Sequence, residues 1–76
     1  MFDRITFDPA VMGGRACIRG MRITVSHVLG LIASGLTVEQ IQQEYPSIEP
    51  DDIREALQYA ARLAEEDLHS LPEPRR

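Results

Sequence analysis

The sequence predicts a mainly α-helical domain in which three helices, the last two forming a helix-turn-helix, follow a short N-terminal β arm. Three observations support this fold class. Apolar residues recur at helical spacing in three segments after residue 24, and capping residues, glycine or proline bound these segments. Before residue 24 the apolar runs are short and separated by turn residues, as is typical of strands. The length of 76 residues fits a single domain.

The N-terminal arm is expected to contain short strands. Ile5-Thr6-Phe7 predicts a strand that Asp8-Pro9 ends, because proline cannot donate to a ladder of backbone hydrogen bonds. A hairpin is expected from residues 16–18 and 21–23, since Arg19-Gly20 between them is a two-residue connection whose glycine can adopt a positive φ. Strands this short are unstable as an isolated pair, so another element should cover them.

Two short helices are expected after the arm. The apolar positions of the first recur every three or four residues: Val25, Val28, Leu29 and Ile32. Ser34-Gly35 then closes this helix. Thr37 lies three residues before Gln40, which is the spacing of a capping box, and predicts the start of a second helix that Pro46 ends.

The third helix is expected to be the longest, starting at Pro50 and ending near His69. Ile48 and Ile53 have the spacing of a hydrophobic staple, in which two apolar side chains fix the entry into a helix. The inward positions share small or apolar side chains: Ile53, Ala56, Leu57, Ala60, Leu63, Ala64 and Leu68. This surface is either the domain core or a seam between two chains, and both can hold.

The chain is expected to be one domain with three parts: the β arm of residues 1–24, the helices of residues 25–69 and a flexible tail of residues 70–76. A domain this short buries only about 60–65% of its unfolded surface, so disulfides, metals or oligomerisation commonly add stability. Cys17 is the single cysteine, which excludes an internal disulfide and a structural zinc site. Self-association remains, and we expect a homodimer without cofactors.

Charge is unevenly distributed within the total of −4. Residues 1–24 carry four arginines against two carboxylates, whereas residues 25–76 carry four arginines against ten. A phosphate backbone would be attracted to the first part and repelled by most of the second. We therefore expect any DNA contact to involve a small set of residues, the first three at phosphates and the last two at base edges: Arg15, Arg19, Arg22, Arg54 and Gln58.

Other classes of protein are disfavoured. No apolar run approaches the roughly 20 residues of a membrane span, and the first residues lack the apolar stretch of a signal peptide, so a cytoplasmic location without a membrane partner is expected. Cys17 is expected to be a core residue rather than a reactive thiol. His27 lacks an evident orienting group and oxyanion hole, so we expect no catalytic site.

A longer pattern carries a family resemblance. Residues 13–23, GGRACIRGMRI, resemble the G-G-x-P-C-I-x-G-T-R-I/V signature of a small prokaryotic family that is similar to VapB-type antitoxins, and the match extends through Ala61. The family's usual proline, threonine and helix cap are here Ala16, Met21 and Glu49. The resemblance implies a winged-helix or homeodomain-like domain, often dimeric, with a PIN-like nuclease toxin as partner.

The leading hypothesis is therefore a non-enzymatic, antitoxin-like protein that dimerises, neutralises a PIN-like ribonuclease and represses its own operon by binding operator DNA. Leu71, Arg75 and Arg76 of the tail are assigned to the toxin, since guanidinium groups pair well with the carboxylates of a nuclease metal site. Two alternatives remain open. One is a free-standing helix-turn-helix transcription regulator, and the other is a structural dimerisation module.

Overall fold

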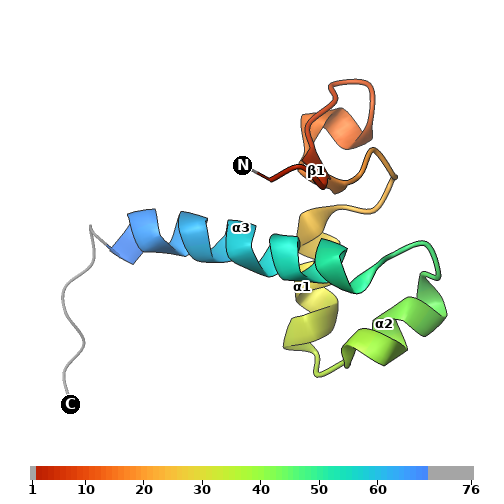
Figure 1. Ribbon diagram of the computed structural model, residues 1–76. Helices are drawn as coiled ribbons and strands as arrows, with labels where there is room; N and C mark the ends of the chain where they lie inside the picture. Colours follow the sequence, from red (N-terminus) through yellow and green to blue (C-terminus); the bar gives the residue numbers. More distant parts are fainter. Residues whose placement is uncertain (1, 69–76) are drawn as a thin grey trace, which may run out of the picture.

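The protein is mainly helical, with a small antiparallel sheet at its N-terminal end (Figure 1). The structure, a computed structural model, describes residues 2–68. Along that part of the chain the elements are β1 (Ile5–Thr6), the 3-10 helix η1 (Met12–Gly14), β2 (Cys17–Ile18), α1 (Val25–Ala33), α2 (Val38–Glu44) and α3 (Pro50–Leu68). The three expected α-helices are thus confirmed, with α3 the longest.

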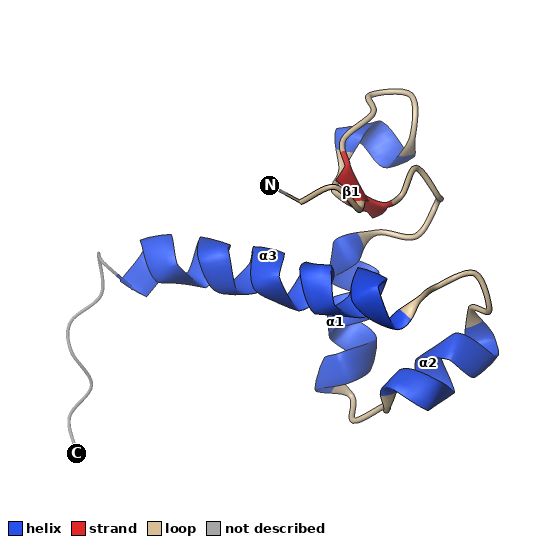
Figure 2. Cartoon of the chain, viewed as in Figure 1, coloured by secondary structure: helices blue, strands red, loops and turns tan. Residues whose placement is uncertain are grey.

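The elements gather around α1 (Figure 2). The N-terminal half of α3 packs against α1, and β1 contacts α3 as well. The C-terminal half of α3 extends away from the other elements (Figures 1 and 2). One end of α3 is therefore a wall of the core, while the other end projects past it (Figure 1).

The N-terminal arm pairs differently from the expected hairpin. The turn itself is confirmed: Arg19 and Gly20 both have positive φ, at 45° and 74°, as type I′ turns require. However, β2 forms its ladder with β1, in the register Ile5 with Ile18, and its contact with the following segment is limited to a hydrogen bond from the N–H of Ile18 to the carbonyl oxygen of Ile23, at 3.0 Å, and an isolated bridge from Cys17 to Thr24. The expected hairpin is therefore formed only in part: residues 21–23 are not a strand, because the chain enters α1 at Val25 soon after it has turned back beside β2.

Local capping sets the helix starts as predicted. Thr24 Oγ1 accepts a hydrogen bond from the N–H of His27 and so caps α1. The capping box of α2 is confirmed: Thr37 Oγ1 accepts from the N–H of Gln40, and Gln40 Oε1 accepts from the N–H of Thr37. Pro50 is the first residue of α3, a position at which the missing proline N–H has no intrahelical partner to lose.

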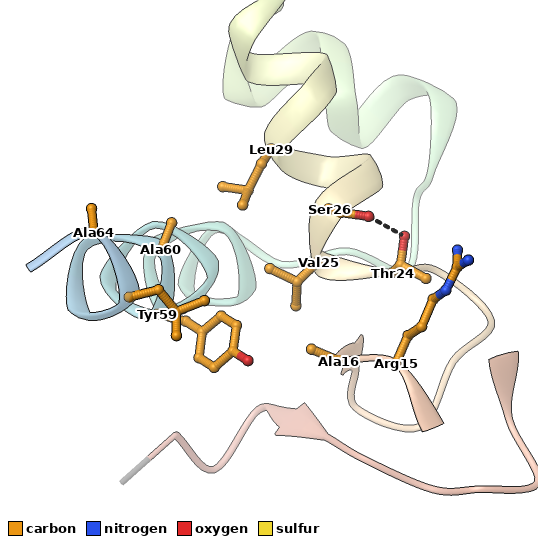
Figure 3. Close-up of a pocket in the computed structure, with 10 residues that line it drawn as sticks. Arg15, Ala16, Thr24, Val25, Ser26, Leu29, Tyr59, Ala60 and Ala64 are labelled. Carbon is orange, nitrogen blue, oxygen red and sulfur yellow. Dashed lines mark hydrogen bonds between the residues drawn. The ribbon is translucent and has the colours of Figure 1, made fainter. Parts of the chain in front are cut away.

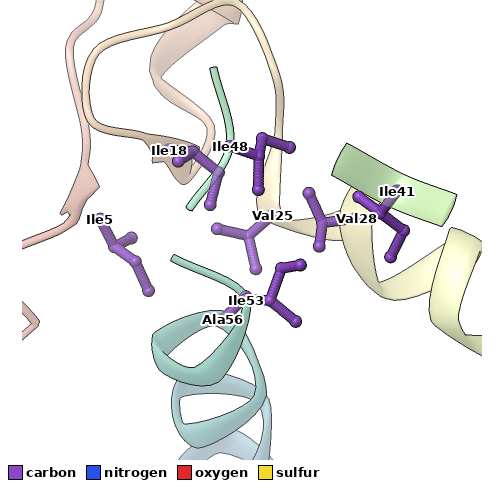
Figure 4. Packing of buried hydrophobic residues seen from close by; sticks show 8 residues of the cluster. All are labelled: Ile5, Ile18, Val25, Val28, Ile41, Ile48, Ile53 and Ala56. Carbon is purple, nitrogen blue, oxygen red and sulfur yellow. The ribbon is translucent and has the colours of Figure 1, made fainter. Parts of the chain in front are cut away.

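A single hydrophobic core joins the arm to the helices (Figure 4). Its buried members come from β1, β2, all three helices and the connection before α3: Ile5, Ile18, Val25, Val28, Ile41, Ile48, Ile53 and Ala56. The staple pair, Ile48 and Ile53, belongs to this cluster. The β arm therefore contributes to the core instead of lying on its surface.

Between residues 57 and 65, α3 contributes no fully buried residue to the core, although the half-buried Tyr59 still packs against it, edge to face with Phe2. Leu57 and Leu63, which were expected to point inward, are 45% and 47% exposed, so the prediction of a buried face along the whole helix was wrong. The reason is the direction of the helices: α1 runs across α3 instead of alongside it, so α1 covers α3 only near the crossing and the rest of α3 extends past it (Figure 1). We call residues 57–65 the α3 extension.

No helix in the described part of the chain is both long and apolar enough to cross a membrane.

Candidate functional site

A buried ionic cluster fastens the β arm to the start of α3. The side chain of Asp52 is fully buried, and Arg19 binds it in a bidentate manner, with Nε 2.9 Å from Oδ1 and Nη2 2.9 Å from Oδ2. Arg4 donates from Nη1 to Oδ1 at 3.0 Å. The N–H of Glu49 donates to Oδ2 at 2.8 Å. Both carboxylate oxygens are thus satisfied, as a buried charge requires.

The two arginines reach further groups of the same helix end. Arg4 also donates from Nη1 to Glu49 Oε1 at 2.8 Å, and its backbone N–H donates to Glu55 Oε1 at 2.9 Å. Arg19 donates from Nη2 to the carbonyl oxygen of Ser47 at 2.6 Å. We call Arg4, Arg19 and Asp52 the arm clamp, because these contacts tie the N-terminal arm to the first turn of α3.

The clamp determines the charge state of its members. Burial by itself raises the pKa of the Asp52 carboxyl, but hydrogen bonds from Arg19, the N–H of Glu49 and Arg4 outweigh burial and hold that pKa below its ordinary value. Hydrogen bonds to Glu49 and Asp52 raise the pKa of Arg4, and the hydrogen bond to Asp52 raises the pKa of Arg19. The cluster is therefore fully ionised at neutral pH.

The residues expected to contact DNA do not form one surface. Arg19 directs its guanidinium group into the arm clamp. Arg54 lies on the exposed side of α3, where Nη1 is 3.3 Å from Oδ1 of Asp51. Gln58 is exposed one turn further along the helix. The three tail residues that were assigned to a toxin, Leu71, Arg75 and Arg76, lie outside the described residues.

Arg15 and Arg22 are brought together in a pocket of about 260 Å³. His27 and Tyr45 also line it, with His27 Nε2 2.8 Å from the Tyr45 hydroxyl and the two rings packed edge to face. Met12, Ile23 and Thr24 complete the lining, so no carboxylate is among the described residues of its wall. We call this the basic pocket.

A larger groove of about 520 Å³ lies between α1 and the α3 extension (Figure 3). Its walls are mostly apolar and come from α3, from α1 and from the chain before β2: Tyr59, Ala60, Leu63, Ala64, Val25, Leu29, Ser26, Thr24, Ala16 and Arg15. The guanidinium group of Arg15 lies beyond Thr24, on the side away from α3 (Figure 3). The part of the groove next to α3 is therefore apolar, and we call it the α3 groove.

The residues that sequence reasoning weighed for chemistry have other partners. Cys17 is 1% exposed in β2, which confirms it as a core residue. His27 pairs with Tyr45. Within residues 2–68 no group of three or more His, Cys, Asp or Glu side chains is arranged to hold a metal ion.

Sequence reasoning missed the arm clamp and both concave sites. Asp52 is separated from Arg19 by 33 residues and from Arg4 by 48, so no local spacing connects them. The usable signal was the excess of arginine in the arm against the carboxylates at the start of the third helix. That contrast indicates an ionic contact, but it does not say which pair forms it.

Known proteins resemble this chain over most of its length. The sequence profile of the family described as "Protein of unknown function (DUF433)" matches residues 5–60. The uncharacterized protein y4eO of Sinorhizobium fredii is 36% identical over 56 residues, which are 74% of this chain and 25% of that protein. The crystal structure of a DUF433 member from Anabaena variabilis superposes with a TM-score of 0.76 at 28% identity, over 84% of this chain and 63% of that one.

These matches correct the resemblance to VapB-type antitoxins. The profile that matches is that of DUF433, and the similar crystal structure is of a DUF433 member, so assignment to a VapB-type family was wrong. The matched region runs from β1 to the middle of α3 and includes the arm clamp's Arg19 and Asp52, the basic pocket and most of the core. The chain belongs to the DUF433 family.

Proposed function

We propose that this protein is a non-enzymatic binding module that works as a pair of chains joined through the α3 extension. The observation that carries the proposal is the α3 groove, the apolar part of a cavity of about 520 Å³, beside a helix on which Leu57 and Leu63 are nearly half exposed. Exposed apolar surface of this kind favours association because burying it releases water. Leu63 lines the groove and is 47% exposed, so it is a large side chain available for that contact.

A second copy of the chain is the occupant that fits this groove. One wall of the groove is the α3 extension, which is also the element that projects from the core. A two-fold arrangement can therefore place each extension over the groove of its partner, and both copies bury the same surface. Ala60 and Ala64 on that wall have small side chains, which allow two helix backbones to approach closely.

We further propose that α2 and α3 form a helix-turn-helix that serves association rather than reading of the major groove. Five residues, 45–49, connect the two helices. In DNA-binding proteins with this motif, the N-terminal residues of the second helix contact base edges. Here that end carries Asp51 and Asp52, and the arm clamp occupies Asp52. Carboxylates at this position repel phosphates, which favours a protein contact.

The absence of catalysis is part of the proposal. Cys17 would need access to a substrate to act as a nucleophile, and its side chain lies in the core. His27 would need a substrate proton within reach, and its Nε2 is bound to Tyr45. These two contacts support a binding role. Neutralisation of a PIN-like nuclease and binding of operator DNA stay predictions about what the paired module does.

Measurement of mass in solution tests the pairing. Light scattering coupled to gel filtration, at tens of micromolar protein, should give twice the mass of one chain. Leu63→Glu places a charge in the α3 groove and should give the mass of a single chain with unchanged circular dichroism, because an unpaired buried carboxylate is strongly unfavourable. Val38→Glu is the matched control, since Val38 is also exposed, at 36%, but lies on α2.

The wild-type mass decides the proposal first. A single-chain mass for the wild type at these concentrations overturns self-association. A two-chain mass that Leu63→Glu leaves intact shows that pairing uses another surface. Loss of pairing in both Leu63→Glu and Val38→Glu also counts against the α3 groove, because it shows that the effect is not specific to that site.

A further inference from the structure

We propose that the basic pocket binds a phosphate group. The pocket combines Arg15, Arg22, His27 and Tyr45 in about 260 Å³. This inference goes beyond the pairing of chains, and it does not depend on it, because the basic pocket and the apolar wall of the α3 groove are formed by different residues. Arg15 and Thr24 border both cavities, and the guanidinium group of Arg15 is directed away from α3 (Figure 3).

The charge of its arginine side chains favours an anion in the basic pocket. The N-terminal arm has four arginines, and two of them, Arg4 and Arg19, are neutralised in the arm clamp. Among the side chains of residues 2–65, Arg15 and Arg22 form no ion pair with a carboxylate, although the protein as a whole is acidic. Two like charges that line one small pocket repel each other, and a bound anion removes this repulsion. The pocket is therefore electrostatically complementary to an anion.

The basic pocket also supplies hydrogen-bond donors that suit a phosphate group. Arginine presents a planar fork of N–H groups that matches the oxygens of phosphate. A neutral His27 carries one N–H and Tyr45 carries one O–H, and their mutual bond uses one of these two protons. Whichever group donates in that bond, the pair keeps one further donor, either the Tyr45 hydroxyl or His27 Nδ1–H. The pocket thus adds a neutral donor to its two cations.

The volume of the basic pocket suits a small ligand group. Pockets for drug-sized ligands occupy about 300–1,000 Å³, and this pocket is smaller, at about 260 Å³. At roughly 30 Å³ per water, it holds the volume of about nine water molecules. A phosphate group fits this space, whereas a complete nucleotide would have to extend out of it. The ligand is therefore an inorganic phosphate or the phosphate of a larger molecule whose remainder lies outside.

The same chemistry can come from two sources. One is a free phosphate or a mononucleotide, and the other is the backbone of a nucleic acid. Both present negatively charged oxygens around a tetrahedral phosphorus, so the pocket lining by itself fits either source. The two differ in what lies beyond the phosphate: a nucleic acid brings neighbouring phosphates, which would add contacts along the surface and a steeper dependence on salt.

Nuclear magnetic resonance titration with inorganic phosphate, at constant ionic strength set with sodium chloride, tests the pocket. The side-chain signals of Arg15, Arg22 and His27 should shift together and saturate. Arg15→Gln and Arg22→Gln should each weaken binding by about tenfold, which corresponds to about 1.4 kcal/mol. Arg62→Gln is the control, because it removes an exposed arginine of α3 outside the pocket and should leave the affinity unchanged.

Arg22→Lys keeps the charge but loses the fork, and it should restore only part of the affinity. Because Arg15 and Arg22 are exposed, the variants should keep the wild-type circular dichroism. Shifts that do not saturate overturn the proposal. Equal weakening by Arg22→Gln and Arg62→Gln also overturns it, since this would reflect net charge rather than a site.

Adenosine monophosphate and a short duplex DNA, used as further probes, distinguish the two sources. Tighter binding of the duplex than of either small phosphate, with a loss in Arg22→Gln, supports the pocket as a contact for a nucleic-acid backbone. Binding of the duplex no tighter than that of adenosine monophosphate supports it as a site for a free phosphate compound. Binding of the duplex that Arg15→Gln and Arg22→Gln leave unchanged contradicts a role of this pocket in it.

Discussion

Arg19 and Asp52 are 33 residues apart in the sequence and form a bidentate ion pair, with two N–O distances of 2.9 Å, at the start of α3. Arg19 holds a positive φ of 45° in the turn after β2, so the turn and the ion pair depend on the same residue. The pair connects the N-terminal arm to α3 through a fully buried carboxylate. An arginine expected to bind DNA thus has an intramolecular role in the fold.

Removing the charge of Asp52 should destabilise the fold. Asp52→Asn leaves Arg4 and Arg19 without their shared carboxylate and weakens the acceptor for the N–H of Glu49. We expect the free energy of unfolding to fall by about 2–3 kcal/mol, at the lower end for a broken buried pair because the two arginine side chains are 29% and 35% exposed. Urea denaturation followed by circular dichroism measures the change.

Asp51→Asn is the matched control for Asp52→Asn. Its carboxylate is exposed, with Oδ1 3.3 Å from Arg54 and Oδ2 at the longer distance of 3.7 Å from Nη2 of Arg4. Surface pairs contribute little, so we expect a change within about 0.5 kcal/mol. Equal effects of the two substitutions would show that burial does not give Asp52 its special role.

The arm clamp should make stability depend on pH in the acidic range. The pKa of Asp52 is held below its ordinary value of 3.8 in the folded chain, so between the two pKa values the unfolded chain binds more protons. The contribution of Asp52 is therefore complete above the ordinary pKa and is lost as the pH falls through the lower, folded pKa. Urea denaturation at several pH values should show this loss in the wild type.

In the Asp52→Asn variant, the free energy of unfolding should depend less on pH over the same acidic range. Since the other carboxylates are common to both proteins, the difference between the two curves isolates Asp52. Curves that remain parallel from neutral pH to below pH 3.8 would contradict the lowered pKa.

Two glycines should respond in opposite ways to alanine. Gly20 has a φ of 74° in the turn after β2, a conformation that alanine adopts only with strain, so Gly20→Ala should destabilise by about 1 kcal/mol. Gly30 lies inside α1 with no heavy atom within 4 Å of an added Cβ. Gly30→Ala should therefore stabilise by about 0.5–1 kcal/mol. Thermal unfolding of both variants checks the signs, and stabilisation by Gly20→Ala would contradict the assigned turn.

Features that depend on neighbouring residues could be predicted from the sequence. The capping box of Thr37 and Gln40 follows from a spacing of three residues, and the Ile48 and Ile53 staple follows from a spacing of five. The positive φ at Gly20 follows from the residue type and the length of the connection. These interactions involve one turn of chain each, so the tertiary structure does not alter them.

Features that depend on distant parts of the chain could not be predicted. The ladder between β2 and β1 joins segments that no turn signal connects, and the start of α1 limits how far the segment after the turn can pair with β2. The apolar period of α3 continues past Ala56, although α1 runs across α3 and does not cover this part, so periodicity alone could not distinguish core from exposed surface. The arm clamp and both concave sites likewise require segments that are far apart in sequence.

The central claim is that two chains pair through the α3 extension, and an isotope-filtered NOE experiment on the wild-type protein tests it most directly. The sample mixes carbon-13-labelled and unlabelled chains, so the experiment records only contacts between different copies. We expect interchain cross-peaks from the methyl groups of Leu63 and Ala60 in one chain to methyl groups in the α3 groove of the other chain, including those of Val25 and Leu29. Interchain cross-peaks only from α2 residues such as Val38, or none at all, would contradict it.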